Sequence, residues 1–157
     1  MIDVTERIAA SPEQVWAVLA TGWTYSGWVV GASHVRAVDP GWPAVGTRVH
    51  HSVGPWPLVT NDATEVLGVE PGRWLELDAR LWPFGAARVR LELSATDGGT
   101  GSGTGGGTDV LMSEQVVRGP AALLPKPLQA ALLIPRNRES LSRLADLAAA
   151  GVGSRQP

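Results

Sequence analysis

Two neighbouring segments of the chain alternate between apolar and polar residues, and this alternation constrains the fold more than any other feature. Every second residue of segments 73–81 and 86–93 is apolar: Leu75, Leu77, Ala79 and Leu81, then Ala87, Val89, Leu91 and Leu93. The sequence Pro83-Phe84-Gly85 between them is typical of a turn. Because successive side chains of a strand point to opposite faces, the pattern predicts an antiparallel sheet with one buried face and one solvated face.

Further segments of the chain also have the character of strands, and several are bounded by Gly or Pro turns. The expected strands are residues 1–8, 34–38, 47–53, 58–67 and 108–117. Residues 23–28 are expected to form a short irregular or helical segment. Residues 97–107 are rich in Gly and lack the Gly-Lys-Ser/Thr ending of a phosphate-binding loop, so they are interpreted as a flexible hairpin connection.

Helices are expected near both ends of the chain. Ser11 and Gln14 can form a capping box at the start of a helix over residues 12–20. The longest helix is expected over residues 128–150, after a Pro-rich connector. Pro135 lies inside this run, where it either kinks the helix or marks its true start. Residues 1–150 are expected to form a single domain, and residues 151–157 a frayed tail.

Composition excludes several classes of function. The 157 residues carry a formal charge of −2, and their basic residues are scattered, which argues against binding to nucleic acid or to a membrane surface. The absence of cysteine excludes disulfides and Cys-ligated metals. No apolar run reaches the ~18 residues that a membrane span needs, and the N-terminus lacks the pattern of a signal peptide. A cytoplasmic location fits these observations.

Three segments of the sequence carry a resemblance to a known family. They are Ala10–Trp16 (ASPEQVW) after the first strand, Val66 with Glu70-Pro71 and Leu75, and Arg136–Leu141 (RNRESL) in the last helix. With this order of elements, the chain resembles the START/Bet v 1-like (SRPBCC) superfamily, and within it the bacterial polyketide cyclase/dehydrase-like group.

The resemblance implies an α+β helix-grip fold, in which a curved seven-stranded antiparallel sheet wraps round the long C-terminal helix. Two short helices follow the first strand, and a cavity lies between the sheet and the long helix. Members bind lipids, hormones, polyketides or other apolar molecules, and some catalyse ring closure or dehydration. The superfamily has no universal set of catalytic residues, so fold alone does not give function here.

Strand parity and helical spacing predict four polar side chains on the cavity side: His51, Asp62, Glu114 and Asn137. Leu58 and Thr64 share the face of Asp62, whereas His50 points to solvent. A buried imidazole or carboxylate must find partners or change its charge state, so His51 with Asp62 or Glu114 is the best hypothesis for acid–base catalysis.

Alternatives to catalysis are open for each of these groups. Asp62 can simply tie down backbone N–H groups, and His51 can be a satisfied core histidine. Glu114 can pair with Arg118, Arg136 or Arg138, or contact a ligand. No metal site is expected, because the adjacent His50 and His51 point to opposite faces of their strand. No cofactor is expected either.

The remaining cavity residues come from strand ends, from mid-strand positions and from the last helix. Trp28 and Trp56 are expected at the mouth, and the wall is expected to include Val49, Thr64, Leu77, Val89, Met112, Leu133 and Leu141. Trp74 is expected on the outer face, as a packing or dimer surface.

The favoured function is binding or carriage of a small hydrophobic molecule. A polyketide cyclase or dehydratase and a protein-interaction module are the alternatives. The oligomeric state, monomer or homodimer, is left open.

Overall fold

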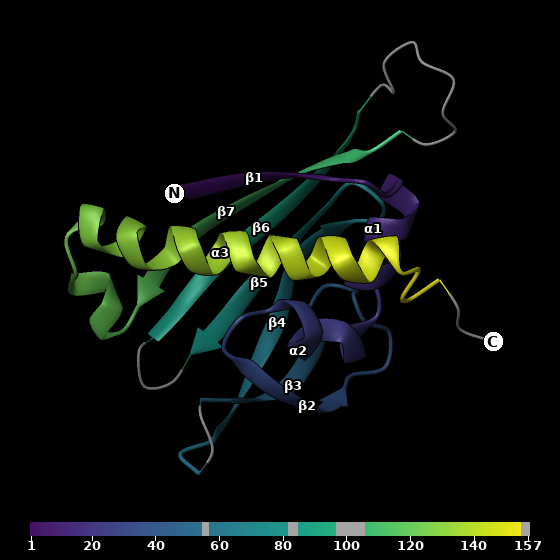
Figure 1. Ribbon diagram of the computed structural model, residues 1–157. Coiled ribbons are helices and arrows are strands. Elements are labelled where there is room, and N and C mark those ends of the chain that lie inside the picture. Colours follow the sequence, from purple (N-terminus) through teal and green to yellow (C-terminus); the bar gives the residue numbers. More distant parts are fainter. Residues whose placement is uncertain (55–56, 82–84, 97–105, 155–157) are drawn as a thin grey trace.

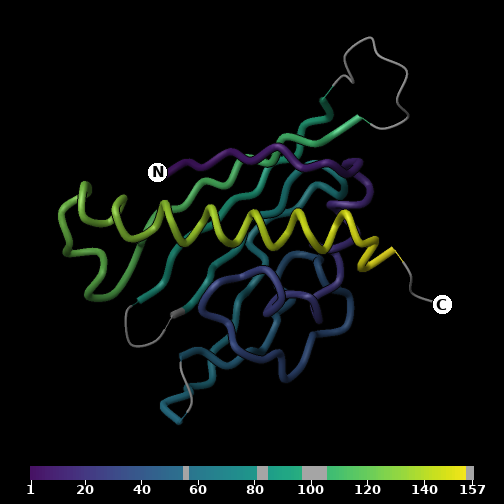
Figure 2. The backbone as a smooth tube through the Cα atoms, viewed as in Figure 1, coloured from purple at the N-terminus to yellow at the C-terminus, as the bar shows by residue number. Residues whose placement is uncertain are grey.

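A seven-stranded antiparallel sheet forms the body of the protein (Figure 1). The computed structural model describes residues 1–54, 57–81, 85–96 and 106–154. The strands are β1 Ile2–Ile8, β2 Ala32–Val38, β3 Arg48–Val53, β4 Thr60–Glu70, β5 Trp74–Leu81, β6 Gly85–Ala95 and β7 Thr108–Arg118. Their order in the sheet is β1-β7-β6-β5-β4-β3-β2, so the first and last strands lie side by side (Figure 2).

The helices lie together on one face of this sheet (Figure 1). They are α1 Pro12–Leu19, the single turn η1 Gly22–Thr24, α2 Tyr25–Trp28, η2 Pro120–Leu123 and α3 Lys126–Ala149. The long helix α3 packs against β1, α1 and α2. This arrangement confirms the predicted α+β helix-grip fold.

The core lies between α3 and the inward faces of the central strands. Leu75, Leu77 and Leu91 project from the sheet, Leu141 and Leu144 project from α3, and each is at most 1% exposed. The alternation that predicted the sheet therefore identifies its buried face correctly. At the start of α1, Ser11 and Gln14 form the predicted capping box, in which each side chain bonds the backbone N–H of the other residue.

The predicted start of the fourth strand is wrong. Leu58 is 78% exposed and lies in the connection between β3 and β4, because the chain turns at Gly54. The turn brings Gly54 close to the carbonyl of Leu58, and its φ of 100° suits glycine. β4 continues to Glu70, past an irregularity in its pairing with β5 between Val66 and Gly68.

Pro135 does not mark the start of α3, which begins at Lys126. Pro127 occupies the first turn of the helix, where a missing N–H costs nothing. Pro135 itself is exposed on the helix surface, so water can reach the backbone carbonyl that lost its partner. Residues 97–105 and 155–157 of the predicted flexible loop and tail lie outside the described residues.

Candidate functional site

A chain of buried polar side chains crosses from the sheet to α2. His51 on β3 is 1% exposed, and its Nε2 lies 3.0 Å from the hydroxyl oxygen of Thr64 on the neighbouring strand β4. The hydroxyl of Tyr25 on α2 lies 2.8 Å from the same oxygen. The rings of Tyr25 and His51 stack, with centroids 5.1 Å apart. These contacts fix the direction in which the His51 ring faces.

In one arrangement of protons, the hydroxyl groups of Tyr25 and Thr64 both donate a hydrogen bond. Tyr25 donates to Thr64, and Thr64 donates its single hydroxyl proton to Nε2 of His51. His51 then carries its proton on Nδ1, which is buried and has no hydrogen-bond partner in the described structure. Burial lowers the pKa of His51, against an opposing effect of the Asp62 charge, and burial raises the pKa of Tyr25 to about 12. Both groups are therefore mainly uncharged at neutral pH.

A second buried cluster joins the last strand to α3. Glu114 on β7 is 1% exposed, and Arg136 on α3 donates from Nη2 to both of its carboxylate oxygens, at 2.7 and 2.6 Å. The neighbouring residue Asn137 is fully buried and donates from Nδ2 to Oε2 of Glu114, at 2.7 Å. Of the pairings that the sequence left open for Glu114, the structure forms the one with Arg136.

An apolar pocket of about 410 Å³ opens at the end of the sheet nearest the start of α3. Glu114 is its only charged lining residue among the described ones, and the others are Gly85, Ala86, Ala87, Val116, Pro120, Ala121, Leu124, Leu132 and Leu133. Nearby leucines are exposed to solvent, with Leu123 at 87% and Leu128 at 47%. The pocket therefore combines apolar walls, one buried carboxylate and neighbouring apolar surface.

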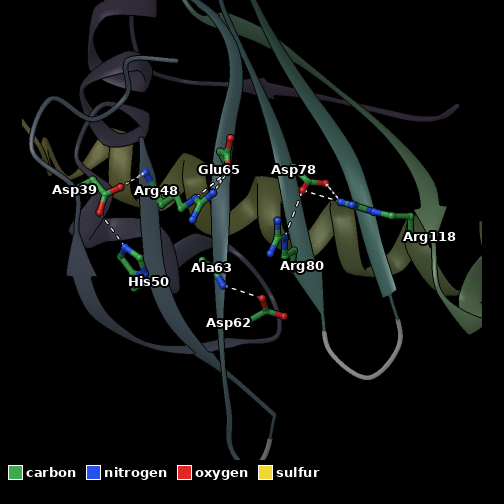
Figure 3. A network of polar contacts seen from close by, with 9 residues as sticks. All are labelled: Asp39, Arg48, His50, Asp62, Ala63, Glu65, Asp78, Arg80 and Arg118. Atoms are coloured by element: carbon green, nitrogen blue, oxygen red, sulfur yellow. Dashed lines mark hydrogen bonds and ion pairs between the residues drawn. The ribbon is translucent and has the colours of Figure 1, made fainter. Parts of the chain in front are cut away.

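A polar hollow of about 510 Å³ lies at the same end of the sheet and shares Gly85 and Ala86 with the apolar pocket. Asp62 lines this hollow, and its carboxylate accepts the backbone N–H of Ala63 at 2.8 Å (Figure 3). Arg80 and Arg118 line it too, and Asp78 binds both of them (Figure 3). Asp62 thus lies with these arginines rather than among the residues that line the apolar pocket.

Most of the predicted wall residues belong to the close-packed core. Val49, Leu77, Val89, Met112 and Leu141 form part of one continuous cluster of buried apolar side chains. Glu114 and Leu133 are the predicted ligand contacts that line the apolar pocket.

The tryptophans occupy varied positions. Trp28 is 3% exposed and makes an edge-to-face contact with Tyr25, so it lies in the core and not at a mouth. Trp74 lies on the outer face, where it donates to Glu70 and the guanidinium of Arg90 covers its ring at 4.1 Å. Trp56 lies outside the described residues.

Sequence reasoning missed Tyr25 and most of the pocket. Tyr25 is the only tyrosine of the chain, and it lies in a helix too short to give a periodic signal. The pocket is built by the connector before α3, in which apolar residues such as Leu124 follow Pro120. The apolar composition of that connector was the available signal.

This fold, with a curved antiparallel sheet and one long helix across it, defines the START/Bet v 1-like class. The family model described as "Polyketide cyclase / dehydrase and lipid transport" matches residues 1–149. The chain therefore belongs to this family and to the SRPBCC superfamily that the sequence predicted.

Solved structures of similar shape agree with this assignment. Ara h 8.0201 superposes with a TM-score of 0.65 at 10% identity, over 94% of this chain and 96% of that one. The ZhuI aromatase/cyclase from Streptomyces sp. R1128 gives 0.64 at 16% identity, over 96% and 94%. Protein CV1439 from Chromobacterium violaceum gives 0.59 at 17% identity, over 93% and 95%. At these identities the likeness shows a shared fold.

A search of curated proteins gives no match for the chain. Among the residues that the structure describes, no helix has both the length and the apolar character needed to cross a bilayer.

Proposed function

We propose that the protein binds a small hydrophobic molecule in the apolar pocket between the start of α3, η2 and the adjacent ends of β6 and β7. The observation that carries the proposal is the pocket itself, of about 410 Å³ and lined by apolar residues apart from Glu114. Small-molecule sites typically have volumes of about 300–1,000 Å³ with few polar groups. The family, whose description combines cyclase, dehydrase and lipid transport, supports a ligand of this kind.

The neighbouring surface is suited to receiving an apolar molecule from another carrier or from a lipid phase. Leu128 and Leu132 on the first turns of α3 are 47% and 58% exposed, and Leu132 also lines the pocket. Burial of apolar surface contributes about 25 cal/mol per Å², so a ligand that covers these side chains gains binding energy from them. Carrying a ligand requires only a binding pocket, whereas converting it would also require catalytic side chains in contact with it.

Acid–base catalysis on a polyketide-like substrate is the second candidate. One observation favours it: Nδ1 of His51 has no hydrogen-bond partner among the described residues, and burial lowers the pKa of this imidazole. A neutral imidazole with a free nitrogen can exchange a proton with a bound substrate. We place catalysis second because His51 is 1% exposed and does not line the apolar pocket, and because Arg136 and Asn137 hold Glu114.

Binding is tested by mass spectrometry and by a pair of matched substitutions. Native and denatured masses of the purified protein are compared to detect a retained ligand, and the neutral dye Nile red is then titrated by fluorescence. Leu133→Trp adds bulk at a pocket-lining position, whereas Leu67→Trp adds the same bulk on β4, at a residue that does not line the pocket. We expect Leu133→Trp to weaken dye binding strongly and Leu67→Trp to leave it unchanged.

Two results bear on the alternatives. Equal dye affinity in the two variants, with both folded by circular dichroism, would contradict binding in this pocket. Turnover of a retained polyketide-like ligand that is abolished by His51→Ala, with the affinity retained, would instead support catalysis.

A further inference from the structure

We propose that Glu114 makes the pocket selective for neutral apolar molecules that carry a hydrogen-bond donor, such as a phenol or an alcohol, and selective against carboxylic acids. The inference rests on the proposed binding function and goes further, because it names the class of ligand. The inference depends on how many acceptor positions of the Glu114 carboxylate are filled by Arg136 and Asn137.

Within the described part of the chain, the hydrogen bonds to the Glu114 carboxylate leave one acceptor position open. Two carboxylate oxygens offer about four lone-pair positions between them. Oε2 accepts from Arg136 and from Asn137, whereas within the described part of the chain Oε1 accepts from Arg136 alone. Glu114 lines the pocket, so our proposal assigns the remaining acceptor position to a ligand that enters it. An ionised carboxylate only accepts hydrogen bonds, so the group that it binds must be a donor.

The charge at this point of the pocket is already balanced. Arg136 and Glu114 form an ion pair at 2.6 Å, and the Arg136 side chain is only 21% exposed. An anionic ligand would meet the carboxylate of Glu114, and the guanidinium that could attract it is engaged in that ion pair. Bringing an unpaired carboxylate into an apolar site costs far more than bringing a hydroxyl, so the pocket disfavours acids.

The other described lining residues supply no competing polar side chain. Apart from Glu114, the described lining consists of Gly, Ala, Val, Pro and Leu residues. One polar contact in an apolar pocket fixes the orientation of the ligand, while the apolar walls supply most of the affinity. We therefore infer that the donor of the ligand points inward to Glu114, and that its apolar body points towards α3 and η2.

Four probes of one shape test this inference on the unaltered protein at pH 7. Naphthalene, 2-naphthol, 2-methoxynaphthalene and 2-naphthoate are each used to displace Nile red. We expect 2-naphthol to bind about tenfold more tightly than naphthalene, because a hydrogen bond to a charged group is worth about that factor. The methoxy compound keeps the oxygen and lacks the donor, so it should lose this gain. We expect 2-naphthoate to bind most weakly.

A substitution then tests whether Glu114 is the group responsible. Glu114→Gln keeps the shape of the side chain and removes its charge, so the positive charge of Arg136 is no longer balanced and can attract an anion. We expect 2-naphthoate to become the tightest ligand of this variant. Glu65→Gln is the matched control, because Glu65 pairs with Arg48 and does not line the pocket. That control should keep the order of the parent protein.

The outcomes separate this inference from the proposed function. Failure of Nile red and of all four probes to bind would overturn both. Equal affinities for naphthalene, 2-naphthol and 2-methoxynaphthalene would overturn the inference and leave the binding function standing. An unchanged order in folded Glu114→Gln would show that another group selects the ligand. Should that variant fail to fold, the comparison of 2-naphthol with 2-methoxynaphthalene on the parent protein still decides whether a donor is required.

Discussion

The hydrogen bonds that join Tyr25, Thr64 and His51 lead to a prediction about the free energy of unfolding. The effect of Tyr25→Phe on stability should depend on whether the Thr64 hydroxyl is present. Thr64→Val replaces the central hydroxyl by a methyl group of similar size. The substitution leaves the Tyr25 hydroxyl and Nε2 of His51 without the partner that each has in the parent, at 2.8 and 3.0 Å. Each buried polar group that loses its partner costs about 1–3 kcal/mol, so we expect a loss of about 2–6 kcal/mol in the free energy of unfolding.

Tyr25→Phe should behave differently in the two backgrounds. In the parent it removes one hydrogen bond and leaves that between Thr64 and His51, so it should cost about 1 kcal/mol. In the Thr64→Val background it removes a buried hydroxyl that no longer has its partner, so it should be neutral or stabilising. The resulting coupling energy should be about 1–3 kcal/mol.

Urea unfolding of the four proteins at pH 7.5 measures this cycle. Circular dichroism should be the main probe, because Trp28 contacts Tyr25 and its fluorescence will respond to the substitution directly. Equal m-values across the set would show that all four proteins unfold from comparably compact states. A cost of Tyr25→Phe that is the same in both backgrounds would refute the hydrogen bond between Tyr25 and Thr64.

Three further predictions concern pH and packing. Because burial lowers the pKa of His51, the unfolded chain binds its proton first, so stability should fall as pH drops below about 6.5, and His51→Gln should flatten this slope in urea unfolding. Gly85→Ala would place a Cβ 1.9 Å from the carbonyl oxygen of Arg118, so it should cost at least about 2 kcal/mol. Gly72→Ala, in open space and at a φ of 77° in the left-handed region, should cost only about 1 kcal/mol. Leu141→Ala should cost about 2–5 kcal/mol in thermal unfolding, because the fully buried side chain leaves a cavity.

The sheet face on which His51 and Glu114 lie could be predicted from the sequence, because their strands pair regularly around these two residues. His51 pairs with Asp62 across β3 and β4, and the irregularity in β4 comes only after Val66. Glu114 pairs with Val89, away from the irregular pairing at the start of β6. The burial of His51 and Glu114 therefore follows from counting residues along regular strands.

The partners of these side chains could not be predicted in the same way. Tyr25 reaches Thr64 through the packing of α2, and periodicity says nothing about how a helix of one turn is oriented on a sheet. Arg136, by contrast, was one of three arginines that sequence reasoning placed near Glu114, and only the position of α3 distinguishes among them. Parity assigns a side chain to a face, whereas its partner depends on the tertiary arrangement.

Tyr25 also relates the two buried clusters to each other. Its hydroxyl bonds Thr64 in the first cluster, and the charges of Arg136 and Glu114 in the second cluster act on its pKa in opposite directions. Charges buried near a group act on it more strongly than they would through water, so Tyr25 is electrostatically coupled to the ion pair at the pocket.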